Sequence, residues 1–161
     1  MPELAQANVA SLRAPLDDPR MRGFLTALAP IHHLAEHSDG FLWRLRTGDD
    51  HGLCVIRDGT GPAFLNLSVW RDYRSLHQFV YRSRHGDLLR QRDRWFDTTR
   101  QPSTVLWWVT TGERPTADDA THRLRHLGTY GPTARAFSLR RQFTASGAPV
   151  ASPRSRSSTP R

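Results

Sequence analysis

The amino-acid sequence predicts an α+β domain in which helices cover one face of an antiparallel sheet. Short segments with an apolar residue at every second position alternate along the chain with longer segments whose apolar residues recur every three or four positions. Turns rich in glycine and proline separate them. The order is β-α-β-(β)-β-α-β followed by α-β, and its first part matches a ferredoxin-like split βαβ unit. Such a unit leaves one sheet face open, and a second copy of the chain is its simplest cover.

The first half of the chain supplies one helix and four strands. Residues 4–10 alternate weakly and form the first expected strand. Asp18 and Pro19 give an N-cap followed by proline at the first helical position, so an amphipathic helix is expected over residues 19–37. The further strands are expected over residues 41–46, 53–57 and 64–70.

Alternation assigns faces to these strands. In the second strand, Phe41 and Trp43 are expected on one face and Arg44 on the other. In the strand over residues 64–70, one apolar set is expected to pack on the helices, and a mixed set of polar and aromatic residues is expected to face a cavity or the dimer. The first set is Leu65, Leu67 and Val69, and the second is Phe64, Asn66, Ser68 and Trp70.

The second half continues with a helix that Asp72 caps and that breaks near residues 83–86. A strand over residues 105–109 follows, and Thr116 then caps another helix, which ends before Gly128 or before Gly131. The remaining expected elements are a last strand over residues 136–143 and, after a domain of residues 1–144, a disordered tail over residues 145–161 rich in Ser, Pro and Arg.

Composition limits the function classes. The chain has 161 residues and a formal net charge of +8, and all 23 of its Lys and Arg residues are arginine. Most arginines are interleaved with acids and no zinc-finger or RNA-binding pattern appears, so specific nucleic-acid binding is not expected. Cys54 lies in an apolar run and is expected to be a buried structural thiol. We see no signal peptide and no membrane span, so a cytoplasmic location is expected.

Residues 64–108 resemble the wall of a small-molecule cavity, because they contain four of the five tryptophans and only a few polar groups at spaced positions. Asn8 and Asn66 are the only asparagines, and both lie in expected strands, where asparagine is disfavoured. They are expected either to hold a ligand carbonyl or enolate-like oxygen or to stabilise the sheet or dimer by hydrogen bonds.

Histidines supply the candidate for proton transfer. His85 is expected to act as a general base or, alternatively, as an axial haem ligand or a backbone-bonded residue at the helix break. His32, His33 and His37 lie near a helix C-terminus. Only His33 and His37 are four residues apart, so interaction with the helix end is favoured over a metal site.

Aromatic residues and one arginine complete the expected binding site. Trp70 shares a face with Asn66 and is the best candidate to stack on a substrate, and Arg44 is a candidate anchor for a carboxylate or phenolate. The further candidates for substrate contact are Trp43, Trp95 and Trp108. For every tryptophan the alternative is packing in the core or dimer interface, with a partner for the indole N–H.

Several motifs in one order carry a resemblance to a known family. They are LAQANV at residues 4–9, GFLWRL at 40–45, NLSVW at 66–70, His85, Trp95-Phe96, LWWV at 106–109 with Gly112 and Pro115, and Gly131-Pro132 followed by Ala136-Phe137. Over residues 4–143 the chain resembles domain-of-unknown-function family 3291, which is related to the dimeric α/β-barrel, or antibiotic-biosynthesis-monooxygenase-like, superfamily. The resemblance implies a ferredoxin-like subunit whose sheet pairs with that of a second subunit to form a barrel.

The resemblance and the cavity-like segment together favour an enzyme for a small, planar, apolar substrate. The superfamily implies cofactor-independent oxygenase, isomerase or cyclase chemistry, with no cofactor required. His85 would abstract a proton, Asn8 and Asn66 would hold the developing oxyanion, and Trp70 would stack on the substrate. Two alternatives stay open: a haem enzyme with His85 as ligand, and an accessory protein that binds a small molecule without turnover.

Overall fold

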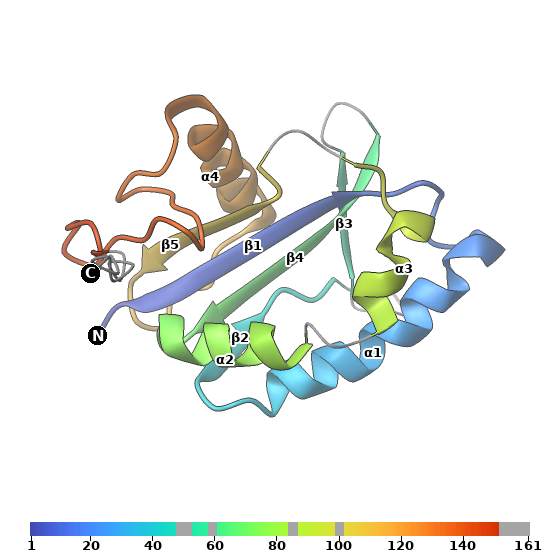
Figure 1. Cartoon of the computed structure of the whole chain (residues 1–161), viewed down its shortest axis with the longest axis horizontal. Coiled ribbons are helices and arrows are strands. Elements are labelled where there is room, and N and C mark those ends of the chain that lie inside the picture. The colour runs from blue at the N-terminus through green and yellow to red at the C-terminus, as the bar shows by residue number, and fades with distance from the viewer. Residues whose placement is uncertain (48–52, 58–60, 84–86, 99–101, 152–161) are drawn as a thin grey trace, which may run out of the picture.

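The computed structural model describes residues 1–47, 53–57, 61–83, 87–98 and 102–151. These residues form the predicted α+β fold, with a five-stranded antiparallel sheet and four α-helices (Figure 1). The elements are β1 (Glu3–Ser11), the short 3-10 helix η1 (Pro19–Met21), α1 (Arg22–Glu36), β2 (Phe41–Arg44), β3 (Cys54–Arg57), β4 (Pro62–Trp70), α2 (Tyr73–Ser83), α3 (Asp87–Trp95), β5 (Thr104–Val109) and α4 (Ala117–Tyr130).

The sheet is built around β4 and β1. Its strand order is β2-β4-β1-β5, and β3 pairs with β4 as well. β3 lies along the first half of β4, where Cys54 is opposite Leu65, and β2 lies along the second half, where Arg44 is opposite Ser68. The described chain does not close into a barrel.

The three predicted caps are present, although Asp18 caps the 3-10 helix η1 and α1 begins only at Arg22. The Asp18 carboxylate accepts a hydrogen bond from the backbone N of Arg20 at 2.9 Å, and the Asp72 carboxylate accepts one from the backbone N of Ser75 at 2.8 Å. Thr116 and Asp119 form a capping box, in which each side chain accepts from the other's backbone N–H. Short polar side chains thus satisfy N–H groups that the helices cannot pair themselves.

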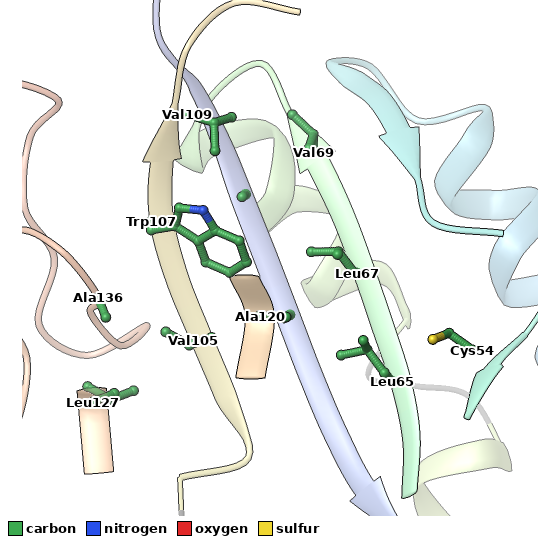
Figure 2. Close-up of a cluster of buried hydrophobic side chains, with 12 residues drawn as sticks. Cys54, Leu65, Leu67, Val69, Val105, Trp107, Val109, Ala120, Leu127 and Ala136 are labelled. Carbon is green, nitrogen blue, oxygen red and sulfur yellow. The ribbon is translucent and has the colours of Figure 1, made fainter. Parts of the chain in front are cut away.

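Helices cover both faces of the sheet, which corrects the prediction of helices on one face only. The first face packs against α4, and we call it the α4 face: Ala5, Ala7, Leu65, Leu67, Val69, Val105 and Trp107 (Figure 2). The second face lies under α1, α2 and α3, and we call it the cavity face: Leu4, Gln6, Asn8, Phe64, Asn66, Ser68 and Trp70. The sequence grouped the β4 residues of the two faces correctly but did not show which helices cover which group.

A bulge in β2 corrects a second prediction. Phe41 is opposite Trp70 of β4, but Trp43 is already opposite the next residue back, Val69, because the register shifts between Phe41 and Trp43. Phe41 therefore packs on the cavity face and Trp43 on the α4 face. Strict alternation had placed both on one face.

The segment after α4 does not form the strand predicted over residues 136–143. Only Phe137 pairs with Leu106 of β5, in an isolated antiparallel bridge. Beyond it, the backbone N of Val150 donates to the carbonyl of Gln142 at 2.8 Å, around a turn at residues 144–147. Residues 152–161 of the predicted tail lie outside the described residues.

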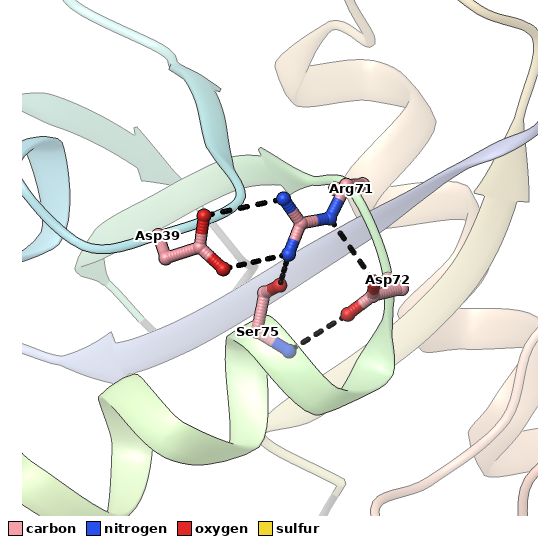
Figure 3. Close-up of polar contacts among 4 residues, drawn as sticks. All are labelled: Asp39, Arg71, Asp72 and Ser75. Atoms are coloured by element: carbon pink, nitrogen blue, oxygen red, sulfur yellow. Dashed lines mark hydrogen bonds and ion pairs between the residues drawn. The ribbon is translucent and has the colours of Figure 1, made fainter.

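A corner between β2 and α2 fixes α2 over the cavity face. The Arg71 guanidinium donates to both carboxylate oxygens of Asp39, at 3.2 and 2.7 Å, and to the Ser75 hydroxyl at 3.2 Å (Figure 3). Gly40 completes the corner with φ +76°, and a Cβ added there would lie 2.1 Å from Ser75 Oγ. A glycine is therefore required at this position both for its backbone angle and for space.

Candidate functional site

A cavity of about 630 Å³ lies between the cavity face of the sheet and the three helices that cover it. Most of its wall is apolar, with five phenylalanines from α1, α2 and three other segments: Phe24, Phe41, Phe64, Phe79 and Phe96. The volume and the apolar wall are those of a site for a small organic molecule.

A row of polar side chains crosses the floor of this cavity on β4 and β1. Trp70 Nε1 donates to Ser68 Oγ at 2.9 Å, and Ser68 Oγ donates to Gln6 Oε1 at 3.0 Å. Gln6 Nε2 then donates to Asn8 Oδ1 at 2.9 Å, and Asn66 Nδ2 donates to the same oxygen at 3.1 Å. All five side chains line the cavity, so we call them the polar row.

The indole of Trp70 sets the direction of the first hydrogen bond in the polar row. An indole N–H only donates, so the Ser68 hydroxyl accepts from it, and its own hydrogen is available for Gln6 Oε1. With its oxygen on Ser68, Gln6 directs its NH₂ toward Asn8, which presents its oxygen. The amide orientations along the polar row are thus consistent with one another.

The polar row leaves two amide ends without a partner among the described residues. Asn8 Nδ2 donates neither of its hydrogens to a described residue, and Asn66 Oδ1 accepts no hydrogen bond from one. Both atoms are accessible from the cavity, because every fully buried side-chain nitrogen or oxygen in the described part of the chain has a hydrogen-bond partner. The cavity floor therefore offers a donor and an acceptor on neighbouring strands at directly opposed positions, Asn8 and Asn66.

A charged group closes the cavity on the side of β2 and α1. Arg44 Nε donates to Glu36 Oε1 at 2.6 Å, and Arg46 Nη2 donates to the same oxygen at 2.5 Å. Hydrogen bonding to Arg44 lowers the pKa of Glu36 despite partial burial. Burial, and then the positive charge of Arg44, lowers the pKa of half-buried His32 to about 4. His32 is therefore neutral at pH 7 and lies in the cavity wall.

The sequence model of the family described as "Domain of unknown function (DUF3291)" matches residues 3–153 of the chain. The chain belongs to this family. Among solved structures, it is similar to the NE2512 protein of unknown function from Nitrosomonas europaea, with 13% identity, a TM-score of 0.44, and coverage of 73% of this chain and 98% of that one. No curated protein matches the chain.

In this DUF3291 protein, four of the predicted site residues line the cavity together: Asn8, Asn66, Trp70 and Arg44. His85, the predicted base, lies outside the described residues. Trp70 is not available for the stacking role given to it, because its ring stacks on Phe79 with centroids 5.1 Å apart and the residue is only 1% exposed. Its contribution to the site is its N–H, which donates to Ser68 in the polar row.

The other three predicted tryptophans do not line the cavity. Trp43 points to the α4 face because of the bulge, where the Arg114 guanidinium lies 6.0 Å from its ring. Trp95 is buried against Phe24 under α1. Trp108 donates from Nε1 to the carbonyl of Phe143 at 2.7 Å. Each of them packs in the core, which was the alternative interpretation of the sequence.

Sequence reasoning gave no role in the site to Gln6, Ser68 or His32, although it placed Ser68 on the face expected to line a cavity or the dimer. Gln6 precedes Asn8 by two positions, so period-two alternation already places them on one face. Its bond to Ser68 depends on the register of β1 against β4, which no local pattern specifies. The role of His32 depends on burial against β2 and so follows only from the packed structure.

Further observations concern the histidines at the end of α1, the single cysteine and the apolar character of the helices. His33 and His37 stack on each other with ring centroids 4.0 Å apart, and His37 Nδ1 lies 2.8 Å from the carbonyl of His33 near the helix end. No cluster of three or more metal-binding side chains occurs among the described residues. Cys54 is buried, as predicted, and forms no disulfide. Within the described ranges, no helix has both the length and the apolar character needed to cross a membrane.

Proposed function

We propose that this protein is a small-molecule enzyme whose substrate carries a carbonyl or enol oxygen, and that the Asn8 amide binds this oxygen. The observation that supports the proposal is the unpaired Asn8 Nδ2 in an apolar cavity of about 630 Å³. An amide N–H that faces an apolar cavity and has no partner among the described residues can donate to an oxygen of a bound ligand.

The chemistry we propose is removal of a proton from the carbon beside the carbonyl group. The C–H electron pair moves into the C–O group, and its oxygen becomes negative. Asn8 Nδ2 donates to that oxygen, and Asn66 Oδ1 accepts from a hydroxyl or N–H of the substrate. The enolate then takes a proton at another carbon, in an isomerisation, or attacks an electrophilic carbon of the same molecule, whose oxygen takes up the proton, in a cyclisation. In a monooxygenase-like reaction, the enolate carbon instead forms a C–O bond with molecular oxygen, and the resulting hydroperoxide loses water, so that one oxygen atom stays on the substrate.

The proton acceptor we propose is His85, as the sequence predicts, with His32 as the alternative. His32 is neutral at pH 7 and lines the cavity. A pKa of about 4 makes it a weak base, which favours His85. The haem-dependent alternative also rests on His85, and a Soret band in the purified protein that His85→Ala abolishes would support it.

The assembly and location belong to the same proposal. The strand order supports a ferredoxin-like subunit, since the N-terminal strand β1 lies between β4 and β5. For a homodimer, the support is two exposed apolar side chains on the strands at one edge of the sheet, Leu42 of β2 and Val55 of β3. A cytoplasmic location agrees with a chain whose single cysteine, Cys54, forms no disulfide. Sedimentation velocity would test the dimer directly.

Exchange of hydrogen for deuterium tests the proposed proton abstraction. The protein is incubated in D₂O with 2-tetralone, a bicyclic ketone, and deuterium at the α-carbon is followed by NMR. We expect exchange above the buffer rate, and a loss of about 100-fold in Asn8→Asp, because this change keeps the acceptor for Gln6 and Asn66 but removes the NH₂ donor. His85→Ala should abolish the exchange and His32→Gln should not.

A matched control separates loss of the donor from gain of a charge. Gln91→Glu makes the same amide-to-acid change on α3, at a residue that does not line the cavity, and it should retain full exchange. If the wild type binds the ketone, as judged by thermal stabilisation, but does not accelerate exchange, the enzyme proposal is wrong and the protein is a binding protein.

A further inference from the structure

Among the described residues, the cavity wall contains basic side chains but no acidic ones. The basic side chains are three arginines and two histidines: Arg44, Arg92, Arg140, His32 and His77. The chain as a whole is less one-sided, with 15 Asp and Glu residues against 23 Lys and Arg residues. A cavity of one charge sign with apolar walls concentrates ligands of the opposite sign.

We propose that the cavity takes an anionic ligand with an apolar body, a carboxylate or sulfonate, whose charged group is bound by the cavity arginines Arg92 and Arg140. This inference rests on the proposed function, because it names the class of molecule that the proposed site accepts. The observation that carries it is that both arginines line the cavity and have no acidic partner among the described residues.

The backbone brings Arg140 to the side of the cavity where Asn8 lies. Asn8 is opposite Thr104 of β5, and Phe137 forms an antiparallel bridge with Leu106 of the same strand. The backbone at Phe137 thus runs antiparallel to β5, and a turn follows in which the backbone N of Ser138 donates to the carbonyl of Arg141 at 3.2 Å. Thr104 and Arg140 accordingly line the same cavity.

Arg92 reaches this part of the cavity from α3. It lies one turn before Phe96, whose backbone N donates to the carbonyl of Arg92 at 2.9 Å. Phe96 in turn bridges to Leu12, just beyond the end of β1. Asn8 and Arg92 both line the cavity near this end of β1.

The charges of Arg92 and Arg140 are not neutralised within the described chain. Neither makes an ion pair or side-chain hydrogen bond with any described residue, whereas Arg44 and Arg71 are each bound to a carboxylate. Both side chains are solvent-exposed, so a ligand group can approach them without displacing a protein partner. A guanidinium makes charge-assisted hydrogen bonds to a carboxylate or sulfonate, and these are stronger than bonds between neutral groups.

A pair of fluorescent probes tests the charge preference in the full chain. 8-Anilinonaphthalene-1-sulfonate and N-phenyl-1-naphthylamine share one apolar body and differ by the sulfonate. We expect the sulfonate to bind about tenfold more tightly than the neutral probe to the wild type. The preference should disappear in Arg92→Gln/Arg140→Gln. It should persist in Arg94→Gln, which removes an exposed arginine of the same helix that does not line the cavity.

The outcomes distinguish this inference from the proposed function. Equal affinity of the two probes for the wild type overturns the anion preference but leaves a ligand cavity intact. A preference that survives Arg92→Gln/Arg140→Gln overturns the assignment to these two arginines. If neither probe binds, the cavity is not a ligand site, and both the proposed function and this inference are wrong. Circular dichroism of each variant confirms that the fold is retained.

Discussion

The two faces of the sheet come from the same strands but have different chemistry. On β4, residues 65, 67 and 69 are Leu, Leu and Val, and each is no more than 2% exposed against α4 and its neighbours (Figure 2). The alternate residues 66 and 68 are Asn and Ser, and they line a cavity. One face is therefore filled by side chains, whereas the other is kept open above a polar row.

This difference indicates that the α4 face contributes more to the free energy of folding than the cavity face does. Closely packed apolar side chains contribute most of the favourable free energy of folding. A polar row under a cavity contributes little net stability, because its hydrogen bonds replace bonds to water. Its retention beside an empty volume of this size agrees better with ligand binding than with a packing role.

The largest expected effect is on the α4 face. Leu67→Ala should lower the free energy of unfolding by about 2–5 kcal/mol, because Leu67 is 1% exposed and a cavity would replace its side chain. Leu28→Ala on α1 should have a smaller effect, since Leu28 already borders the open cavity. Urea unfolding of both variants measures this. Equal losses would show that the cavity side is packed as tightly as the α4 face.

A smaller loss is expected in the polar row. Gln6→Leu should lower the free energy of unfolding by about 1–3 kcal/mol, because Ser68 Oγ and Asn8 Oδ1 each lose a partner at a site where Gln6 is 7% exposed. The double variant Gln6→Leu/Ser68→Ala should lose less than the sum of the two single variants, since one unpaired hydroxyl is then absent. Additive losses in this double-mutant cycle would mean that the polar row is not a connected network.

Much of the fold could be predicted from the sequence because its signals are local. The caps Asp18, Asp72 and Thr116 and the period-two strands each depend on a few adjacent residues. The last strand was predicted on alternation alone and fails, since only Phe137 finds a partner on β5. Alternation shows which side chains share a face, but a strand also requires a neighbouring edge over its whole length.

Residues of the candidate site could be predicted only where the alternation of side chains along a strand was enough to assign their face. Asn8 and Asn66 were expected on the cavity side, and they lie directly opposite each other. Trp43 was misplaced because one bulge reverses the parity after Phe41. Gln6 was missed because its bond to Ser68 joins residues 62 positions apart in the sequence, and such a contact follows only from the strand register.

The smallest expected effect is a pH dependence confined to the cavity side. Burial, with help from Arg44, lowers the pKa of His32 from 6.5 to about 4 in the folded state. Between these two pKa values, His32 binds a proton in the unfolded chain but not in the folded one. Its effect on stability is therefore absent well above pH 6.5, and the free energy of unfolding decreases as the pH falls below that value. The urea midpoint of the wild type should therefore fall more from pH 7 to 5 than that of His32→Gln.

Leu67→Ala, on the α4 face, should instead shift the midpoint equally at both pH values. A wild type and His32→Gln that respond alike would mean that His32 is solvated, and the cavity side would then be more open than its packing against Arg44 and Glu36 indicates.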